Sequence, residues 1–289
     1  MITVIGSINM DIVVETAIFP KQGETVLGTS FHTVPGGKGS NQAVAAARLG
    51  SDIHMVGAVG NDAFGKEMVS VLAAENIEHS FVKQGEKATG IANITLFEND
   101  NRIVVVPGAN SELNEQDIDA AKSLIEQSDL VIMQLEIPQD TVEYALGVCK
   151  EVGTKVLLNP APAESFKVEW MDRIEYFTPN ETECVEIFKD DVDQALEKFP
   201  NRLIVTLGSK GARYFDGDKH VFVESYKTTA VDTTGAGDTF NGAFAYAITN
   251  NYSIEEAVQF ANIAASLSVE KFGAQGGMPQ LDAVLNRLK

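Results

Sequence analysis

The sequence predicts an α/β protein in which helices surround a mostly parallel central sheet and a small β-sheet forms a separate appendage. Between residues 115 and 206, segments with helical spacing alternate with short apolar runs, which is the pattern of βα units. Short extended pieces broken by proline and glycine occur at 12–34 and in a hairpin at 88–106, and such pieces suit an antiparallel sheet apart from the main one. We expect residues 1–289 to form one domain, since no long linker or internal repeat divides them.

The composition argues against several classes of partner. A net charge of −19 at pH 7 opposes non-specific binding to nucleic acid, which depends on Lys and Arg neutralising phosphates. No apolar run approaches the ~18–20 residues of a membrane span, and residues 1–5 carry no basic leader, so we expect no membrane association and a cytoplasmic location. The two cysteines, Cys149 and Cys184, are expected to be buried free thiols.

The first strand is expected at residues 2–6, an apolar run that ends in glycine. Asn9 and Asp11 follow at its carboxyl end, the position where open α/β sheets bind ligands. Both residues suit hydrogen bonds to a polyol, and local caps in a turn explain them as well. Extended pieces at 12–15, 24–28 and 30–34 then begin the small sheet.

A glycine-rich stretch at residues 35–42, PGGKGSNQ, opens an alanine-rich helix that we expect to end before Gly50. Glycines let the backbone approach a ligand closely, so this stretch is either a binding site or a glycine-rich turn before a helix. A strand and turn at 53–62 and a helix from about 64 to 75 follow. Residues 88–97 and 102–106 flank a turn at 98–101 and complete the small sheet as a hairpin.

From residue 115 the chain alternates strictly between helix and strand patterns. We expect helices at 115–127, 140–151, 162–171 and 181–188, and strands at 130–134, 155–158, 174–177 and 203–206. Polar residues and glycines follow these strands, namely Gln134, Glu136, Asn159, Asn180, Glu183, Thr206, Gly208, Ser209 and Gly211. Because the carboxyl ends of parallel strands meet at one edge of a sheet, these residues predict a ligand crevice.

The C-terminal third contains a loop that enters a helix. A hairpin at 214–223 leads to Asp232 and then to Gly235-Ala236-Gly237, where a helix reaching residue 248 begins; a helix at 254–269 precedes a loop at 273–277. Backbone N–H groups at such a junction form an anion site. Asp238 follows at once, and it either caps its own helix or acts as a general base.

The sequence lacks the common catalytic motifs. There is no GxxxxGK[ST] phosphate loop, no GxGxxG fingerprint and no GxSxG elbow, and the four histidines are scattered singly. Phosphoryl transfer remains, because it needs few covalent partners: one group to deprotonate the acceptor hydroxyl and another to stabilise charge on the phosphoryl group. Asp238 can supply the first and the amides of residues 235–237 the second.

Two separated signatures resemble those of the ribokinase-like (PfkB) carbohydrate kinases. Residues 232–242, DTTGAGDTFNG, resemble the C-terminal signature of that family, and residues 36–43, GGKGSNQA, resemble its N-terminal signature. Segments at 6–11, 133–136, 159–163, 179–183 and 206–211 follow in the family's order, so the resemblance covers essentially the whole chain. It implies a three-layer α/β fold with a β-sheet lid formed by 12–34 and 88–106, and ATP-dependent transfer to the 5-hydroxyl of D-ribose.

The resemblance also implies roles for individual residues. Asp238 would be the catalytic base, and the amides of Gly235, Ala236 and Gly237 would form the anion hole. The residues implied to hold the sugar with Asp238 are Asn9, Asp11, Gly37, Lys38, Asn41 and Glu136. Those implied to line the nucleotide site are Asn180, Thr206, Gly208, Ser209, Gly211, Gly237 and Asn262. Glu183 would help to position Mg²⁺ through water.

A monovalent cation and a dimer are further implications of the resemblance. K⁺ would be held by Asp232, the Thr234 backbone and groups around Ser268, Lys271 and Gly273. The chain departs from the family pattern at Gly277, where a serine is expected as the last cation ligand. The lid is implied to pair with that of a second subunit, which gives a homodimer.

Two other functions fit the same residues. The acceptor could be another sugar or a nucleoside, with the mechanism unchanged. Alternatively, the chain could be a non-catalytic sugar-binding protein that has kept the scaffold, although a binding module does not need a base behind an anion hole.

Overall fold

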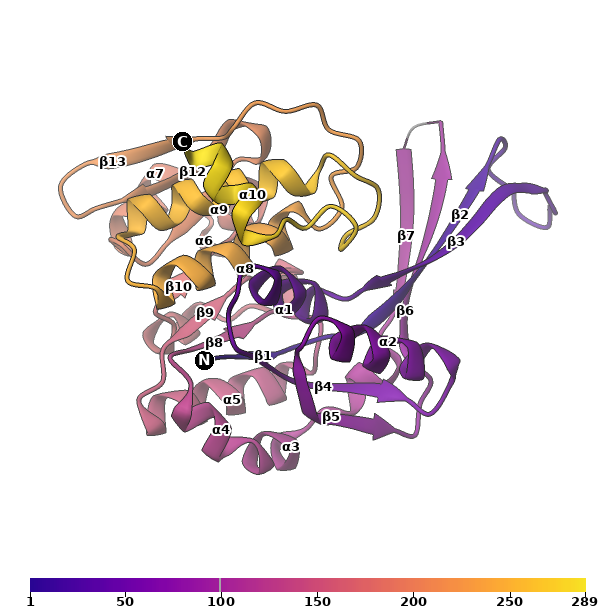
Figure 1. Ribbon diagram of the computed structural model, residues 1–289, viewed down its shortest axis with the longest axis horizontal. Helices are drawn as coiled ribbons and strands as arrows, with labels where there is room; N and C mark the ends of the chain where they lie inside the picture. The colour runs from indigo at the N-terminus through magenta and orange to yellow at the C-terminus, as the bar shows by residue number, and fades with distance from the viewer. Residues whose placement is uncertain (99) are drawn as a thin grey trace.

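A six-stranded parallel sheet forms the middle layer of the computed structural model, which describes residues 1–98 and 100–289 (Figure 1). Its strand order is β10-β9-β8-β1-β4-β5, and every neighbouring pair is parallel. The strands are β1 (Ile2–Ile5), β4 (Ile53–Gly60), β5 (Glu78–Gly85), β8 (Leu130–Met133), β9 (Val156–Leu158) and β10 (Tyr176–Phe177). All four residues of β1 are buried, because helices cover both faces of this central strand.

A second sheet continues the first beyond β10. It consists of β11 (Ile204–Thr206), β12 (Gly211–Phe215) and β13 (His220–Glu224), paired antiparallel in that order. Two isolated parallel bridges, Phe177 to Leu203 and Asn180 to Thr206, place β11 beside β10. The predicted parallel sheet and the predicted hairpin near 214–223 are therefore both present.

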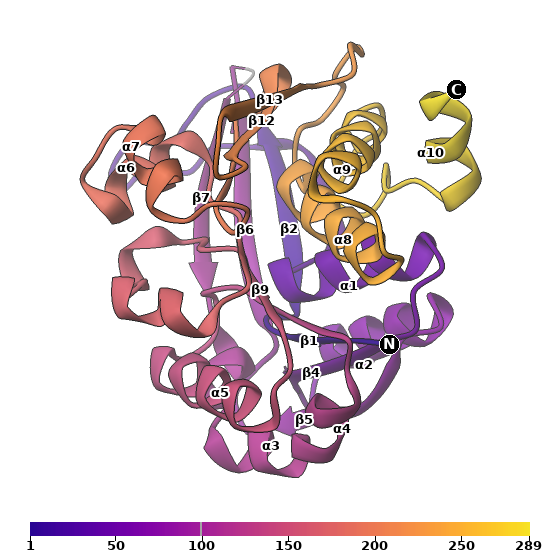
Figure 2. The ribbon, with the colours of Figure 1, turned by 90° about the vertical axis from the view of Figure 1, so that its left-hand side faces the viewer.

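Helices cover the two faces of the sheet and give a three-layer arrangement (Figure 2). One core lies beneath α1 (Lys38–Arg48), α2 (Ala63–Ala74), α8 (Ala236–Thr249), α9 (Ile254–Ser268) and α10 (Leu281–Leu288). The other lies beneath α3 (Glu115–Ala120), α4 (Lys122–Gln127), α5 (Gln139–Val152), α6 (Glu181–Phe188) and α7 (Val192–Lys198). The expected α/β fold with a mostly parallel sheet is confirmed.

The small sheet projects from the side of this body (Figure 1). Its order is β3-β2-β6-β7, with β2 (Asn9–Thr16), β3 (Gly28–Gly36), β6 (Gly90–Phe97) and β7 (Asp100–Val106). The sheet is mixed where we expected an antiparallel one, because β2 runs parallel to β6. Asn99, in the expected turn at 98–101, lies outside the described residues.

Several predicted elements differ in detail. Residues 162–171 form two short 3₁₀ helices, η2 (Ala163–Ser165) and η3 (Val168–Arg173), and not the expected helix. Phe166 between them is extended, and its ring packs against Trp170 and Phe177, so burial of aromatic rings overrides helical propensity there. Residues 24–28 form no strand before Gly28, and β5, α7 and α10 were not predicted at all.

Helices α1 and α8 pack closely because small residues lie between them. A Cβ atom added to Gly242 of α8 would lie 2.6 Å from the Cβ of Ala45 and 2.7 Å from the carbonyl oxygen of Gln42, both in α1. Gly147, which is half-buried in α5, has no such neighbour within 4 Å. These two helical glycines therefore form a matched pair.

We expect Gly242→Ala to lower the free energy of unfolding by about 1–3 kcal/mol, because the added methyl group separates two packed backbones. Gly147→Ala should raise it by about 0.5–1 kcal/mol, since alanine loses less backbone entropy in a helix. Urea unfolding of both variants measures the difference. Equal effects at the two positions would contradict the packing argument.

Candidate active site

The carboxylate of Asp238 lies at the contact between α8 and α1. Its Oδ2 accepts a hydrogen bond from Asn41 Nδ2 at 2.9 Å, and its Oδ1 accepts one from Gln42 Nε2 at 3.0 Å. The side chain is only 8% exposed. Within residues 1–98 and 100–289 these amides are its recorded partners, so Asp238 is held by the neighbouring helix and does not cap its own.

The turn before α8 leaves backbone N–H groups for a ligand. Gly235 is the residue before the helix and is left-handed, with φ of 78°. The N–H of Ala236 already donates to the carbonyl of Thr233 at 3.2 Å. No hydrogen bond in the described part of the chain engages the N–H of Gly235 or Gly237, and these two amides at a helix N-terminus suit an anion.

The residues implied to hold a sugar gather around Asp238. Glu136 Oε2 accepts hydrogen bonds from Ser7 Oγ at 2.6 Å and from the N–H of Lys38 at 3.2 Å, so it joins the end of β8 to the start of α1. Gly37 is required there, because its φ is 87° and a Cβ atom would lie 2.6 Å from the nitrogen of Asn9. The carboxylates of Asp11, Glu136 and Asp238 form one charged cluster with the Lys38 side chain.

Several charged side chains lie close together in this cluster. The pKa of Asp11 is raised from its ordinary 3.8 to about 7, chiefly by burial and further by the nearby carboxylates of Glu136 and Asp238, against the opposing effect of Lys38. Burial by itself lowers the pKa of Lys38, but the surrounding carboxylates, led by Asp238, bring it above its ordinary value. Lys38 therefore stays protonated at neutral pH, whereas Asp11 titrates there.

A cavity of ≈ 500 Å³ lies beside the start of α8 and is lined by most of the residues implied to bind a nucleotide. Its lining includes Thr206, Gly208, Ser209, Gly211, Gly237 and Asn262. Its volume lies in the range of small-molecule sites. Asn180 and Glu183 are not in this lining; they form a capping box at the N-terminus of α6, with Glu183 accepting from the N–H of Asn180 at 2.8 Å. Burial raises the pKa of Glu183.

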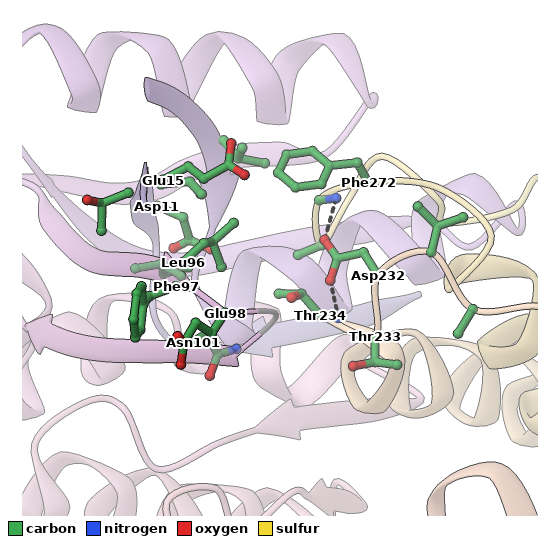
Figure 3. Close-up of a pocket in the computed structure, with 18 residues that line it drawn as sticks. Asp11, Glu15, Leu96, Phe97, Glu98, Asn101, Asp232, Thr233, Thr234 and Phe272 are labelled. Carbon is green, nitrogen blue, oxygen red and sulfur yellow. Dashed lines mark hydrogen bonds between the residues drawn. The ribbon is translucent and has the colours of Figure 1, made fainter. Parts of the chain in front are cut away.

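A second cavity, of ≈ 600 Å³, lies between the small sheet and the loops at 230–234 and 272–274 (Figure 3). Four carboxylates line it, those of Asp11, Glu15, Glu98 and Asp232. Thr233 and Ala230 line both cavities. The two spaces therefore adjoin at the loop that leads into Gly235 and Asp238.

Asp232 ties together the two loops that border this second cavity. Its Oδ1 accepts from the N–H of Thr234 at 2.9 Å and its Oδ2 from the N–H of Gly273 at 2.8 Å (Figure 3). Gly277 lies against the end of α9, where a Cβ atom would come 1.8 Å from the carbonyl oxygen of Ser268. A serine side chain does not fit at position 277 without a backbone shift, and Lys271 is exposed.

The sequence argument missed residues that support the cluster from behind. Asn110 donates from Nδ2 to Asn9 Oδ1 at 2.7 Å and accepts from the N–H of Ile8 at 2.9 Å. Gln42 and Gln275 were seen only as parts of motifs, although each contacts the Asp238 region. Burial is the signal that would have indicated a role for these amides, but a single sequence does not distinguish a buried amide from a surface one.

Among the described residues, no three His, Cys, Asp or Glu side chains gather in a way that could hold a metal ion. Both cysteines are buried free thiols, as predicted, and burial raises the pKa of each to about 12. No helix in this part of the chain combines the length and the apolar character needed to cross a membrane.

These features suit group transfer: a buried carboxylate lies in the first turn of a helix, and two cavities adjoin at the loop that leads into that helix. The model of the pfkB family carbohydrate kinases matches residues 1–281, so the chain belongs to that family.

Three known proteins show how similar individual members are. The chain is 48% identical to the ribokinase of Lactococcus lactis subsp. lactis (strain IL1403), over 100% of this chain and 97% of that protein. The crystal structure of ribokinase from Thermotoga maritima matches with a TM-score of 0.92 at 36% identity, over 99% of this chain and 98% of that one. Arabidopsis thaliana ribokinase complexed with ribose and ATP matches with a TM-score of 0.87 at 33% identity, over 100% and 98%.

The raised pKa of Asp11 makes the stability of the ligand-free protein depend on pH. Protonation of Asp11 favours the folded chain, so this contribution is complete below the unfolded-state pKa near 3.8 and is lost as pH rises through about 7. Asp11→Asn keeps a neutral side chain at every pH. We expect it to be more stable than the parent at pH 8 by about 1–4 kcal/mol, with a smaller gap at pH 5.

Denaturant unfolding of the parent and Asp11→Asn at pH 5, 6, 7 and 8 measures this gap. A gap that does not widen with pH would show that Asp11 carries no unfavourable charge in the folded protein.

Proposed function

We propose that this protein is an ATP-dependent kinase that phosphorylates the 5-hydroxyl of D-ribose to give D-ribose 5-phosphate and ADP. The observation that carries the proposal is the position of Asp238 directly after the open amides of Gly235 and Gly237, at the start of a helix whose leading loop borders both cavities. Membership of the pfkB family and 48% identity to a protein named ribokinase support ribose as the acceptor.

The chemistry follows from the groups present. A sugar held among Asn9, Asp11, Lys38, Asn41 and Glu136 meets both donors and acceptors, as hydroxyl groups require. Asp238 accepts the proton of the attacking hydroxyl, since its carboxylate is fixed by two amide donors and is close to the anion site. The amides of Gly235 and Gly237 and the α8 dipole stabilise charge on the transferred phosphoryl group.

In the proposed site, Mg²⁺ is bound mainly by the phosphates of the nucleotide and less by protein side chains. Mg²⁺ in kinase sites is bound by substrate phosphates, water and one or two carboxylates, and it neutralises developing charge on the phosphates. Glu183 is the candidate carboxylate, because it is partly buried and its pKa responds to Lys38, which also lies beside Asp238. Asn180 positions Glu183 through the capping box.

K⁺ is proposed as an activator held near Asp232, with oxygens from the Thr234 backbone and from groups around Ser268, Lys271 and Gly273. Support comes from Asp232, which joins both loops at this place. Gly277 offers no side-chain oxygen, so any contribution from it is through the backbone. Turnover in K⁺ against tetramethylammonium at equal ionic strength tests the proposal; equal rates would exclude activation.

The central prediction is that Asp238→Asn lowers kcat by about 10²–10⁴-fold, because an amide cannot accept the hydroxyl proton. Ribose binding and the unfolding temperature should change far less. A coupled ADP-release assay with ATP, Mg²⁺ and D-ribose measures turnover, and calorimetry measures ribose binding. More than a tenth of the parent's kcat in this variant would refute Asp238 as the base.

The same assay with 2-deoxyribose, fructose and a nucleoside separates the acceptors. A preference for any of these over ribose would decide for the alternative sugar or nucleoside kinase. Ribose binding without ADP release by the parent protein would instead decide for the non-catalytic reading.

A homodimer through the small sheet is the proposed assembly, with this sheet acting as a lid over the second cavity. Exposed apolar side chains support it: Phe31 on β3 is 62% exposed and Val104 on β7 is 64% exposed. β3 and β7 are the two edge strands of the small sheet, and exposed apolar side chains on edge strands are typical of an interaction site.

We expect Val104→Glu to convert the dimer to a monomer, because a charge would be buried in the interface. Val168→Glu, at a valine of the main body that is 44% exposed, serves as the matched control and should remain dimeric. Light scattering after size-exclusion chromatography measures the mass. A monomeric parent protein, or a dimeric Val104→Glu, would contradict the lid dimer.

A further inference from the structure

Each of the two side-chain amides that contact Asp238 accepts a hydrogen bond from a further glutamine. On one side, Gln275 Nε2 donates to Asn41 Oδ1 at 3.0 Å, and Asn41 Nδ2 donates to Asp238. On the other, Gln134 Nε2 donates to Gln42 Oε1 at 2.8 Å, and Gln42 Nε2 donates to Asp238. These residues belong to four separate segments of the chain, and all are buried.

The direction of these hydrogen bonds is set by Asp238. An ionised carboxylate only accepts, so Asn41 must present its NH₂ group to Asp238 and turn its oxygen the other way. That oxygen needs a donor in a buried place, and Gln275 supplies it. Gln275 therefore fixes which end of the Asn41 amide faces the carboxylate.

Gln275 is well anchored for this task. It is 5% exposed, and its Nε2 also donates to Ser40 Oγ at 3.0 Å. Its own carbonyl accepts from Arg48 Nη1 at 2.6 Å, and Arg48 is paired with Glu75. Both the backbone and the side chain of Gln275 are thus held by residues of α1.

We propose that Gln275 is a positioning residue for the transfer step, acting on Asp238 through the amide of Asn41. The same loop holds Asp232 through the N–H of Gly273, so Gln275 also joins the proposed cation loop to the proposed base. This inference rests on the proposed role of Asp238 as the base.

The first test is Gln275→Leu, which keeps much of the volume and removes the donor. Asn41 is then free to turn its oxygen toward Asp238, so we expect kcat to fall about 10-fold, while the KM for ATP changes less than about 2-fold. Met278→Leu, a volume-conserving change at a buried residue of the neighbouring turn, should leave both constants unchanged.

A double-mutant cycle with Asn41→Ala distinguishes positioning from packing. If Gln275 acts through Asn41, adding Gln275→Leu to Asn41→Ala should lower kcat by less than about 2-fold, because the residue it orients is already gone. An unchanged kcat in Gln275→Leu, or the same 10-fold loss in the Asn41→Ala background, would overturn the inference. Neither result affects Asp238 as the base, which Asp238→Asn tests independently.

Discussion

The hydrogen bonds from Asn41 and Gln42 to Asp238 are the contact on which the site depends. They cross from α1 to α8, and they exist only because the two helices approach closely at Gly242. A buried carboxylate without such donors carries a large desolvation cost. Close packing of two helices therefore fixes the position of the proposed base and satisfies its charge at the same time.

The sheet explains why the remaining groups arrive at this place. β1 lies between β4 on one side and β8 on the other, so the chain leaves β1 at a point where the strand order reverses. Such a point leaves a crevice at the carboxyl ends of the strands. Ser7 and Glu136, which follow β1 and β8, meet there and share a hydrogen bond of 2.6 Å. The small sheet begins two residues later, at Asn9, and so forms one wall of the second cavity.

Much of this could be predicted from the sequence, because the signals were local. Alternating apolar runs predicted the parallel sheet, and the glycines before Asp238 predicted a loop that opens a helix. The parallel pairing of β2 with β6 could not be predicted, since it joins segments about 80 residues apart. β5 was missed because its polar residues occupy an edge of the sheet, where burial imposes little pattern.

The site residues divide in the same way. Asp238, Asn41 and the glycines at 235 and 237 lie within short motifs, and these motifs indicate their chemistry. Gln275 is different, because its partner Asn41 is 234 positions away and a lone glutamine in a glycine-rich loop carries no local signal. Its meaning depends on which atoms of Asn41 face Asp238, and that orientation is a property of the folded chain.

Charge shows how so acidic a chain can hold an anion. With a net charge of −19, the protein as a whole repels phosphate, so attraction must come from neutral N–H groups and from local cations. In the proposed site the amides of Gly235 and Gly237 are the neutral donors, and Lys38 in the neighbouring sugar cluster is a local cation that its carboxylate neighbours keep protonated. One of those neighbours, Asp11, is costly to keep ionised, as its pKa of about 7 shows. Sugar hydroxyls donate hydrogen bonds to carboxylates, so a sugar bound at the proposed site would relieve part of that cost.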